Sequence, residues 1–158
     1  MDKFTKTFFI TSIFILIGLL FQVDFTGFTT KETYEHALVT RIVDGDTFEI
    51  QNGKHIRMIC INTPEKGEAY SKEATLYLSE LLLHKEVLLE KDKTTKDQFK
   101  RELRYVRNLE NNHLYNLDPV EQGLATYYPI EPNTKYCPLI KKAEQQAQEQ
   151  KLGIWSST

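Results

Sequence analysis

The stretch from Val39 to Glu65 constrains the fold of this chain more than any other. Three short apolar runs follow one another, separated by Asp44-Gly45-Asp46 and Asn52-Gly53; they are Val39–Val43, Thr47–Ile50 and Ile56–Ile61. Alternating apolar residues and an Asn-Gly step are typical of antiparallel strands joined by tight turns. We therefore expect three consecutive strands, with Gly45 allowing a sharp turn between the first two.

Polar side chains gather at the ends of these expected strands. Asp44 and Asp46 flank the first turn, and Asn62-Thr63-Pro64-Glu65 follows the third strand, where the proline stops the backbone ladder. We expect these groups to converge at one strand end, with Arg57 a few residues upstream. Carboxylate and amide oxygens beside a guanidinium suit a hard cation and a phosphodiester together.

The rest of the chain predicts two further strands and three helices. Apolar spacing predicts helices over 71–83 and 138–151, and a short helix is expected over 117–124. Further strands are expected over 87–90 and in the second half of 91–107. Five short strands with inserted and appended helices predict an α+β fold, a five-stranded oligonucleotide-binding (OB) barrel. A ferredoxin-like sandwich fits less well, because the first three strands follow one another without a helix.

The segment 91–107 is locally basic in a chain whose net charge is -2. It contains seven Lys or Arg residues and three Asp or Glu residues, a local charge of +4. Such a run usually forms a solvated surface, but beside a cation site it becomes a candidate phosphate track. The nearly neutral chain as a whole argues against a protein that coats nucleic acid through bulk charge.

The N-terminal segment predicts export. Lys3 and Lys6 precede the almost wholly apolar run Phe8–Val23, which is typical of a signal peptide or of an uncleaved signal anchor. Length does not decide between them, and the lack of an A-x-A-like site slightly favours the anchor. Lysines before the run and acids after it place the domain outside. We therefore expect residues 1–30 to be a targeting segment with a tether. Residues 31–158 would be a domain that is secreted or held at the outer face of the membrane.

Cys60 and Cys137 are the two cysteines of the chain. In an exported domain, an isolated pair can form a disulfide. With Cys60 on the third strand and Cys137 just before the last helix, such a bond would tie helix to sheet. Two buried free thiols are an equally weighted alternative, because the sequence does not supply the distance between them.

Four motifs in order make residues 37–156 resemble the staphylococcal nuclease (thermonuclease) family. Asp44-Gly45-Asp46-Thr47 is similar to the family's D-G-D-T element, and Arg57 with Asn62-Thr63-Pro64-Glu65 is similar to R-x4-[DN]-T-P-E. Asp97–Arg101 lies where the family carries D-x-Y-G-R, and Glu144–Trp155 resembles its closing helix. Each motif alone is weak, whereas all four in order are specific.

The resemblance implies a calcium-dependent phosphodiesterase that cuts DNA and RNA, with single strands preferred, and leaves 3′-phosphates. Asp46, Asn62 and the main-chain oxygen of Thr63 would bind Ca2+, and Asp44 would lie just behind these ligands. Asn62 stands where the best-known member has an aspartate. An amide oxygen can still bind calcium, but one negative charge fewer weakens the affinity. We expect a monomer that reaches the membrane only through an uncleaved N-terminal segment.

The resemblance also implies the catalytic residues. Glu65 would orient or deprotonate the attacking water, which is a general-base role. Arg57 and Arg101 would hold the phosphate and stabilise the charge that grows on its oxygens.

Phe99, Lys100 and Tyr128 are the expected substrate contacts. Phe99 replaces a tyrosine whose hydroxyl reaches phosphate in the best-known family member, and Lys100 replaces a glycine. If that glycine relied on a positive φ, we expect the backbone at Lys100 to adjust, while the extra lysine adds phosphate affinity. Tyr128, in a loop rich in Pro, Asn and Tyr, would stack on bases or pack onto the barrel.

Two other functions stay open. A barrel of this family that has lost turnover would hold nucleic acid or a protein without cutting it, and Asn62 and Lys100 favour this alternative. A structural calcium site on an extracellular interaction domain would raise the melting temperature in calcium without binding nucleic acid.

Overall fold

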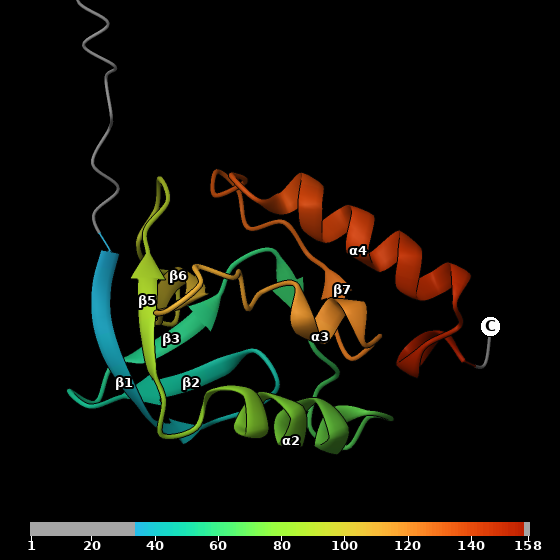
Figure 1. Cartoon of the computed structure of the whole chain (residues 1–158), viewed down its shortest axis with the longest axis horizontal. Helices are drawn as coiled ribbons and strands as arrows, with labels where there is room; N and C mark the ends of the chain where they lie inside the picture. Colours follow the sequence, from blue (N-terminus) through green and yellow to red (C-terminus); the bar gives the residue numbers. More distant parts are fainter. Residues whose placement is uncertain (1–33, 157–158) are drawn as a thin grey trace, which may run out of the picture. The chain divides into compact units, whose positions relative to one another are not determined.

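Five strands close into a barrel in the computed structural model of the protein, which describes residues 34–156 (Figure 1). The order around the barrel is β1-β2-β3-β6-β5, and the neighbours are antiparallel except for the parallel pair β3–β6. The predicted five-stranded barrel is confirmed. Its strands are β1 (Tyr34–Ile42), β2 (Thr47–Ile50), β3 (His55–Met58), β5 (Glu86–Glu90) and β6 (Glu102–Asn108).

Strand β1 closes the barrel because it pairs with two neighbours. Residues 34–38 pair with β5, and the register with β2 begins at Val39, opposite Ile50. The β1–β2 register shifts between Val39 and Arg41, and such a bulge bends a strand and increases its twist. We expected the strand to start at Val39. It starts at Tyr34, because its first half finds a partner far away in the sequence.

The third predicted strand, 56–61, is two strands in the structure. β3 ends at Met58, and Cys60 adopts a left-handed φ of 66°, which interrupts the ladder. β4 (Ile61–Asn62) then pairs with β7 (Thr126–Tyr127) in a separate two-stranded sheet. Asn62 therefore lies outside the barrel sheet, directly after the turn that follows β3.

Three α-helices and a short 3-10 turn, η1 (Gly153–Trp155), complete the described part of the chain. Ala74, Leu78 and Leu82 form the buried face of the first, as the apolar spacing predicts. Figure 1 shows this helix beside β1 and β2, and the last helix on the side of β7. The α-helices are α2 (Ser71–Leu82), α3 (Asp118–Glu121) and α4 (Cys137–Glu149).

The predicted targeting segment, residues 1–30, lies outside the described residues. Within 34–156, no helix has the length and apolar character needed to cross a bilayer.

Cys60 and Cys137 form a disulfide, with their Cα atoms 5.5 Å apart. Of the two alternatives left open by the sequence, the structure therefore has the bonded one. Cys60 lies in the turn between β3 and β4 and not on a strand, while Cys137 is the first residue of α4. The bond thus ties α4 to the turn that leads into Asn62.

We expect the disulfide to contribute substantially to stability, because it joins residues 77 positions apart. Cross-linking a loop of this length lowers the entropy of the unfolded chain, and the corresponding stabilisation is about 4.5 kcal/mol. The double variant Cys60→Ala with Cys137→Ala should therefore unfold at lower urea concentration. A reducing agent should lower the midpoint of the parent protein and leave that of the variant unchanged. Equal midpoints for parent and variant would contradict this expectation.

Candidate functional site

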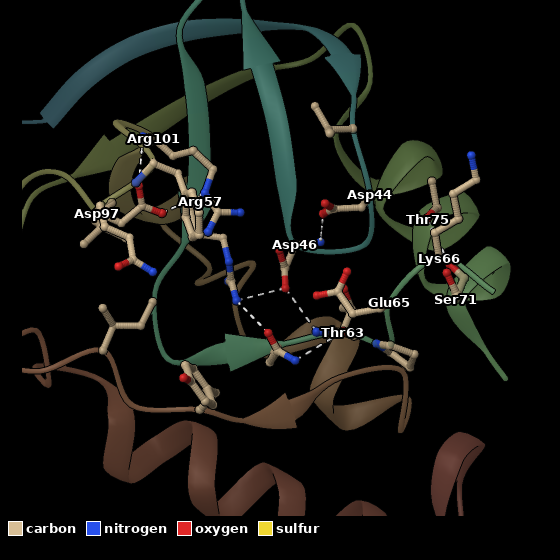
Figure 2. Close-up of a pocket in the computed structure, with 18 of the residues that line it drawn as sticks. Asp44, Asp46, Arg57, Thr63, Glu65, Lys66, Ser71, Thr75, Asp97 and Arg101 are labelled. Carbon is tan, nitrogen blue, oxygen red and sulfur yellow. Dashed lines mark hydrogen bonds and ion pairs between the residues drawn. The ribbon is translucent and has the colours of Figure 1, made fainter. Parts of the chain in front are cut away.

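A cleft of about 1090 Å³ opens between the loop before β2, the segment 62–67, the first turns of α2 and the loop before β6 (Figure 2). The strand ends converge here, as the sequence indicates. All residues predicted as catalytic or as calcium ligands, and the residue placed behind those ligands, line this one cleft; they are Asp44, Asp46, Arg57, Asn62, Thr63, Glu65 and Arg101.

A buried ion pair between Asp46 and Arg57 lies at the centre of the cleft. Arg57 Nη2 lies 3.0 Å from Asp46 Oδ2, and the same oxygen accepts a hydrogen bond of 3.0 Å from the main-chain amide of Thr63. Asp46 Oδ1 accepts a bond of 2.9 Å from the hydroxyl of Thr47. Arg57 Nη1 donates to the main-chain oxygen of Met58 at 2.6 Å. Both side chains are therefore held in fixed positions (Figure 2).

Burial changes the acid–base behaviour of this pair. Asp46 is 5% exposed and Arg57 is 4% exposed. Burial raises the pKa of Asp46, the neighbouring charge of Arg57 opposes that rise, and the charge of Asp44 adds to it. Burial also lowers the pKa of Arg57, although a guanidinium stays protonated in proteins.

Gly45 is needed here because of a close approach and not because of a special backbone angle. A Cβ atom at this position would lie 2.7 Å from the Cβ of Ala74 and 2.8 Å from the Cγ2 of Thr63. The backbone does bend at residues 44–46, but the φ of Gly45 is not in the left-handed range, so the bend does not depend on a positive φ. The missing side chain lets the loop that carries Asp46 pack against Thr63 and α2.

Asp97 orients Arg101. Asp97 Oδ1 accepts hydrogen bonds of 2.9 Å from the main-chain amides of Phe99 and Arg101, and Asp97 Oδ2 accepts one of 2.7 Å from Arg101 Nε. Arg101 Nη1 reaches the hydroxyl of Thr47 at 3.4 Å. Besides burial, the charge of Arg101 lowers the pKa of Arg57. Two guanidiniums thus lie close enough to repel each other, which favours an anion between them. Asp97 was not predicted as a site residue, although its position four residues before Arg101 was a signal in the sequence.

Glu65 lies across the cleft from Asp97 and Arg101 (Figure 2). Its main-chain amide donates to Glu68 Oε2 at 2.7 Å, and its side chain is exposed. Figure 2 shows its carboxylate turned into the cleft, toward Asp46. An exposed carboxylate in this position can accept a proton from water that enters the cleft.

The predicted calcium ligands are adjacent, but the amide of Asn62 is engaged with its neighbours. Its Oδ1 accepts a hydrogen bond of 3.0 Å from Arg57 Nη2, and its Nδ2 donates to the main-chain oxygen of Thr63 at 3.3 Å. The amide nitrogen therefore faces the carbonyl that the resemblance assigns to calcium. For both oxygens to bind one cation, the amide would have to turn over.

The donor chemistry of the cleft nevertheless fits Ca2+. The carboxylates of Asp44, Asp46 and Glu65 line the cleft together with Asn62 and Thr63, and calcium takes oxygen ligands, including water, in flexible geometry. Within residues 34–156, no three His, Cys, Asp or Glu side chains are close enough to form a metal site by themselves. A cation held here would need amide, main-chain, water or substrate oxygens to complete its shell.

The expected substrate contacts surround the cleft. Phe99 is 69% exposed, with the Arg101 guanidinium 5.4 Å from its ring centroid. Tyr128 is 55% exposed and lines the cleft, so it is not packed into the barrel. Lys100 adopts a φ of 65°. The expected adjustment of the backbone is therefore wrong: the lysine itself takes the left-handed conformation that favours glycine.

The basic run 91–107 is not one continuous phosphate track. Arg104 and Arg107 are buried in ion pairs with Glu102 and Glu90. The members that line the cleft are Lys96 and Arg101.

Two further lysines line the cleft and were not predicted from the sequence. Lys66 follows Glu65 directly, and Lys72 lies in the first turn of α2. The proximity of Lys66 to the T-P-E motif was a signal, whereas the position of Lys72 depends on how α2 packs.

Comparison with known proteins agrees with this geometry. A family model described as "Staphylococcal nuclease homologue" matches residues 55–157. The chain is 33% identical to a thermonuclease of Staphylococcus intermedius, over 98% of this chain and 99% of that protein. It is 36% identical to a thermonuclease of Staphylococcus hyicus, over 80% of this chain and 78% of that protein. It is also 34% identical to the endonuclease YncB of Bacillus subtilis, over 75% of this chain and 60% of that protein.

Replacing Arg57 with Met should destabilise the protein more at high pH than at low pH. Without the guanidinium, the pKa of Asp46 in the folded protein should rise further above its value in the unfolded chain. Stability is then lost as the pH rises toward that folded pKa, because the folded state retains a proton that the unfolded state has released. At about pH 8 we expect a loss of roughly 3–5 kcal/mol, the usual cost of breaking a buried pair, and a smaller loss near about pH 5.

Urea unfolding at the two pH values, in the presence of a chelator, measures this difference. Arg41→Met is the matched control, because Arg41 pairs with Glu49 at the surface and is 55% exposed. The control should change stability little at either pH. Equal losses for Arg57→Met at both pH values would show that Asp46 does not titrate as described.

Proposed function

The chain belongs to the staphylococcal nuclease family, and on that premise we propose that it is a calcium-dependent nuclease that hydrolyses phosphodiester bonds of DNA and RNA. The observation that carries the proposal is the meeting of Glu65, Asp46 and the guanidiniums of Arg57 and Arg101 in one cleft. Relatives named as thermonucleases and endonucleases support it.

The two arginines would bind and stabilise the reacting phosphate. Arg57 is fixed by Asp46, Asn62 and the main chain, and Arg101 is fixed by Asp97. Guanidiniums that are already oriented need little reorganisation when charge develops on the phosphate oxygens, so they stabilise the transition state more than the bound substrate. Removing one such donor typically costs about 100- to 1000-fold in rate.

Glu65 would act as the general base. Its carboxylate accepts a proton from water as the water oxygen forms its bond to phosphorus. The bond between phosphorus and the 5′-oxygen breaks on the opposite side, and the 5′-oxygen takes up a proton from water, which leaves a 5′-hydroxyl and a 3′-phosphate. The exposure of Glu65 supports this role, because water reaches it directly.

Asp46, Asn62 and the main-chain oxygen of Thr63 would hold Ca2+. When bound, calcium supplies a Lewis acid that withdraws charge from the phosphate. Asp44 Oδ1 accepts a hydrogen bond of 3.1 Å from the main-chain amide of Asp46. This bond fixes the loop that presents the Asp46 carboxylate to the cleft.

We propose that single strands are the preferred substrates. Phe99 and Tyr128 are exposed beside the cleft, and aromatic rings in such positions stack on bases that are free of a duplex. The groups named above all come from one chain, which supports activity as a monomer.

We also propose that the domain from residue 31 onward works outside the cytoplasm, secreted or held at the membrane by residues 1–30. The disulfide between Cys60 and Cys137 supports this location, because disulfides persist in oxidising compartments.

Glu65→Gln and Arg101→Ala should each lower cleavage of a fluorophore-quenched single-stranded DNA by about 100-fold or more. The parent protein should cut this substrate with calcium and not with a chelator. Glu73→Gln is the matched control, because Glu73 lies in the first turn of α2 and does not line the cleft.

If either variant keeps most of the parent rate, the role given to that residue is wrong. If the parent binds DNA across a range of calcium concentrations without cutting it, the chain is a binding module of the same family. Calcium that raises the melting temperature without DNA binding would indicate a structural calcium site instead.

Asn62→Asp should tighten calcium binding. The substitution adds a negative charge to the ligand set, and calcium affinity follows ligand charge. We expect the calcium concentration for half-maximal cleavage to fall by about 10-fold, because one additional well-placed charge changes such an equilibrium by roughly 1–2 kcal/mol. Isothermal titration with calcium alone gives an independent measurement. An unchanged or higher calcium requirement would show that residue 62 does not bind the ion.

A further inference from the structure

A second, smaller depression of about 270 Å³ adjoins the cleft. Lys96, Phe99 and Arg101 line both hollows, so the two meet at the exposed ring of Phe99. We propose that this depression, called the outer subsite below, binds a phosphate and an adjacent base of a single strand that extends beyond the reacting bond. The proposal rests on the nuclease function and adds a substrate feature to it: the enzyme should favour strands long enough to fill both hollows. The complete lining is Gly53, Lys54, His55, Lys96, Phe99, Lys100, Arg101 and Glu102.

The charge of the outer subsite suits a phosphate. Lys54, Lys96, Lys100 and Arg101 are basic, and the single acid among the described lining residues is Glu102. Glu102 is buried, and it is already neutralised by Lys54 at 3.2 Å and by Arg104.

Lys96 and Lys100 supply positive charge that no ion pair within residues 34–156 holds, although the charge of Lys96 also acts on the nearby Glu102. Both are exposed, and no carboxylate in the described part of the chain lies within ion-pair distance of either. Exposed lysines without an ion-pair partner can neutralise a phosphate, and binding is then favoured by release of the counterions of the nucleic acid.

Phe99 is suited to hold a base at the boundary between the two hollows. A phenyl ring has no hydroxyl to offer a phosphate, so its exposed face can contribute only by apolar contact or stacking. The hydrogen bond from its main-chain amide to Asp97 fixes the loop that carries the ring. The Arg101 guanidinium against the ring makes the pair a mixed stacking and phosphate-binding surface.

Lys100 provides a separate indication. It lines the outer subsite and not the main cleft, and it keeps a φ of 65° that a glycine would adopt at lower cost. A non-glycine residue in such a conformation is a reason to look for a function of its side chain. Binding of a phosphate by the ammonium group of Lys100 in the outer subsite would be such a function.

Binding of thymidine oligonucleotides to the Glu65→Gln protein in calcium tests the proposal without cleavage. For a hexamer, Lys100→Gln should weaken binding by about 3- to 10-fold, and should lower the slope of log affinity against log salt by about 0.7, the value for one phosphate contact on a single strand. For a trimer, the loss should be less than half as large on a logarithmic scale. Lys142→Gln, which removes another exposed charge, from α4 outside both hollows, should change neither the affinity nor the salt slope.

A fluorescent reporter tests the stacking role separately. Phe99→Trp should lose much of its emission when the hexamer binds, because a base stacks on the indole. Leu139→Trp is the matched control: Leu139 is also exposed, but it lies on α4 and lines neither hollow, so its emission should not respond.

The outcomes separate this proposal from the nuclease function. Suppose that the hexamer is bound and that the parent protein cuts it. If Lys100→Gln then binds the hexamer as Lys142→Gln does, and the emission of Phe99→Trp is not quenched, the proposal of the outer subsite is wrong. The nuclease proposal stands in that case. If the parent protein neither binds nor cuts oligonucleotides, both proposals fail.

Discussion

The ion pair between Asp46 and Arg57 connects the parts of the site to the barrel. One carboxylate oxygen of Asp46 accepts from Arg57 on β3 and from the amide of Thr63 beyond β4, so three segments meet at that atom. Both side chains are largely buried, and a buried charge without its partner is costly. This contact holds the loop before β2, strand β3 and the two-stranded sheet together. Both charged groups also line the open cleft. A metal ion would be attracted there by the carboxylate of Asp46, and a phosphate by the guanidinium of Arg57.

Much of this site could be predicted from the sequence because its residues belong to local motifs. The turn at Asp44-Gly45-Asp46 and the segment from Asn62 to Glu65 follow directly on strands, so their convergence depends mainly on short-range pairing. The features that could not be predicted depend on packing between distant segments. Gly45 is explained by its contacts with α2 and Thr63, and β4 by its pairing with β7. Arg104 was counted as a surface charge because the sequence does not show that β6 is buried.

The left-handed residues illustrate the same limit. Cys60 and Lys100 both have positive φ, and neither residue type indicates that conformation. At Cys60, the conformation ends β3 and directs the chain toward Asn62. At Lys100, it turns a loop whose ends are held by Asp97, so that Phe99 faces solvent while Arg101 faces the cleft. In both cases an unfavourable local geometry is fixed by surrounding contacts, and both lie within a few residues of the cleft, where such strain is commonly found.

The cross-link between Cys60 and Cys137 encloses β4, α2, β5, β6, α3 and β7 within one covalent loop. The loop also contains the exposed segment 93–96, where a protease can reach the backbone. A single cut there would leave two pieces joined through sulfur, with Arg57 on one piece and Arg101 on the other. Such a nicked molecule can keep both arginines in the same barrel, and its fragments would separate only after the disulfide is reduced.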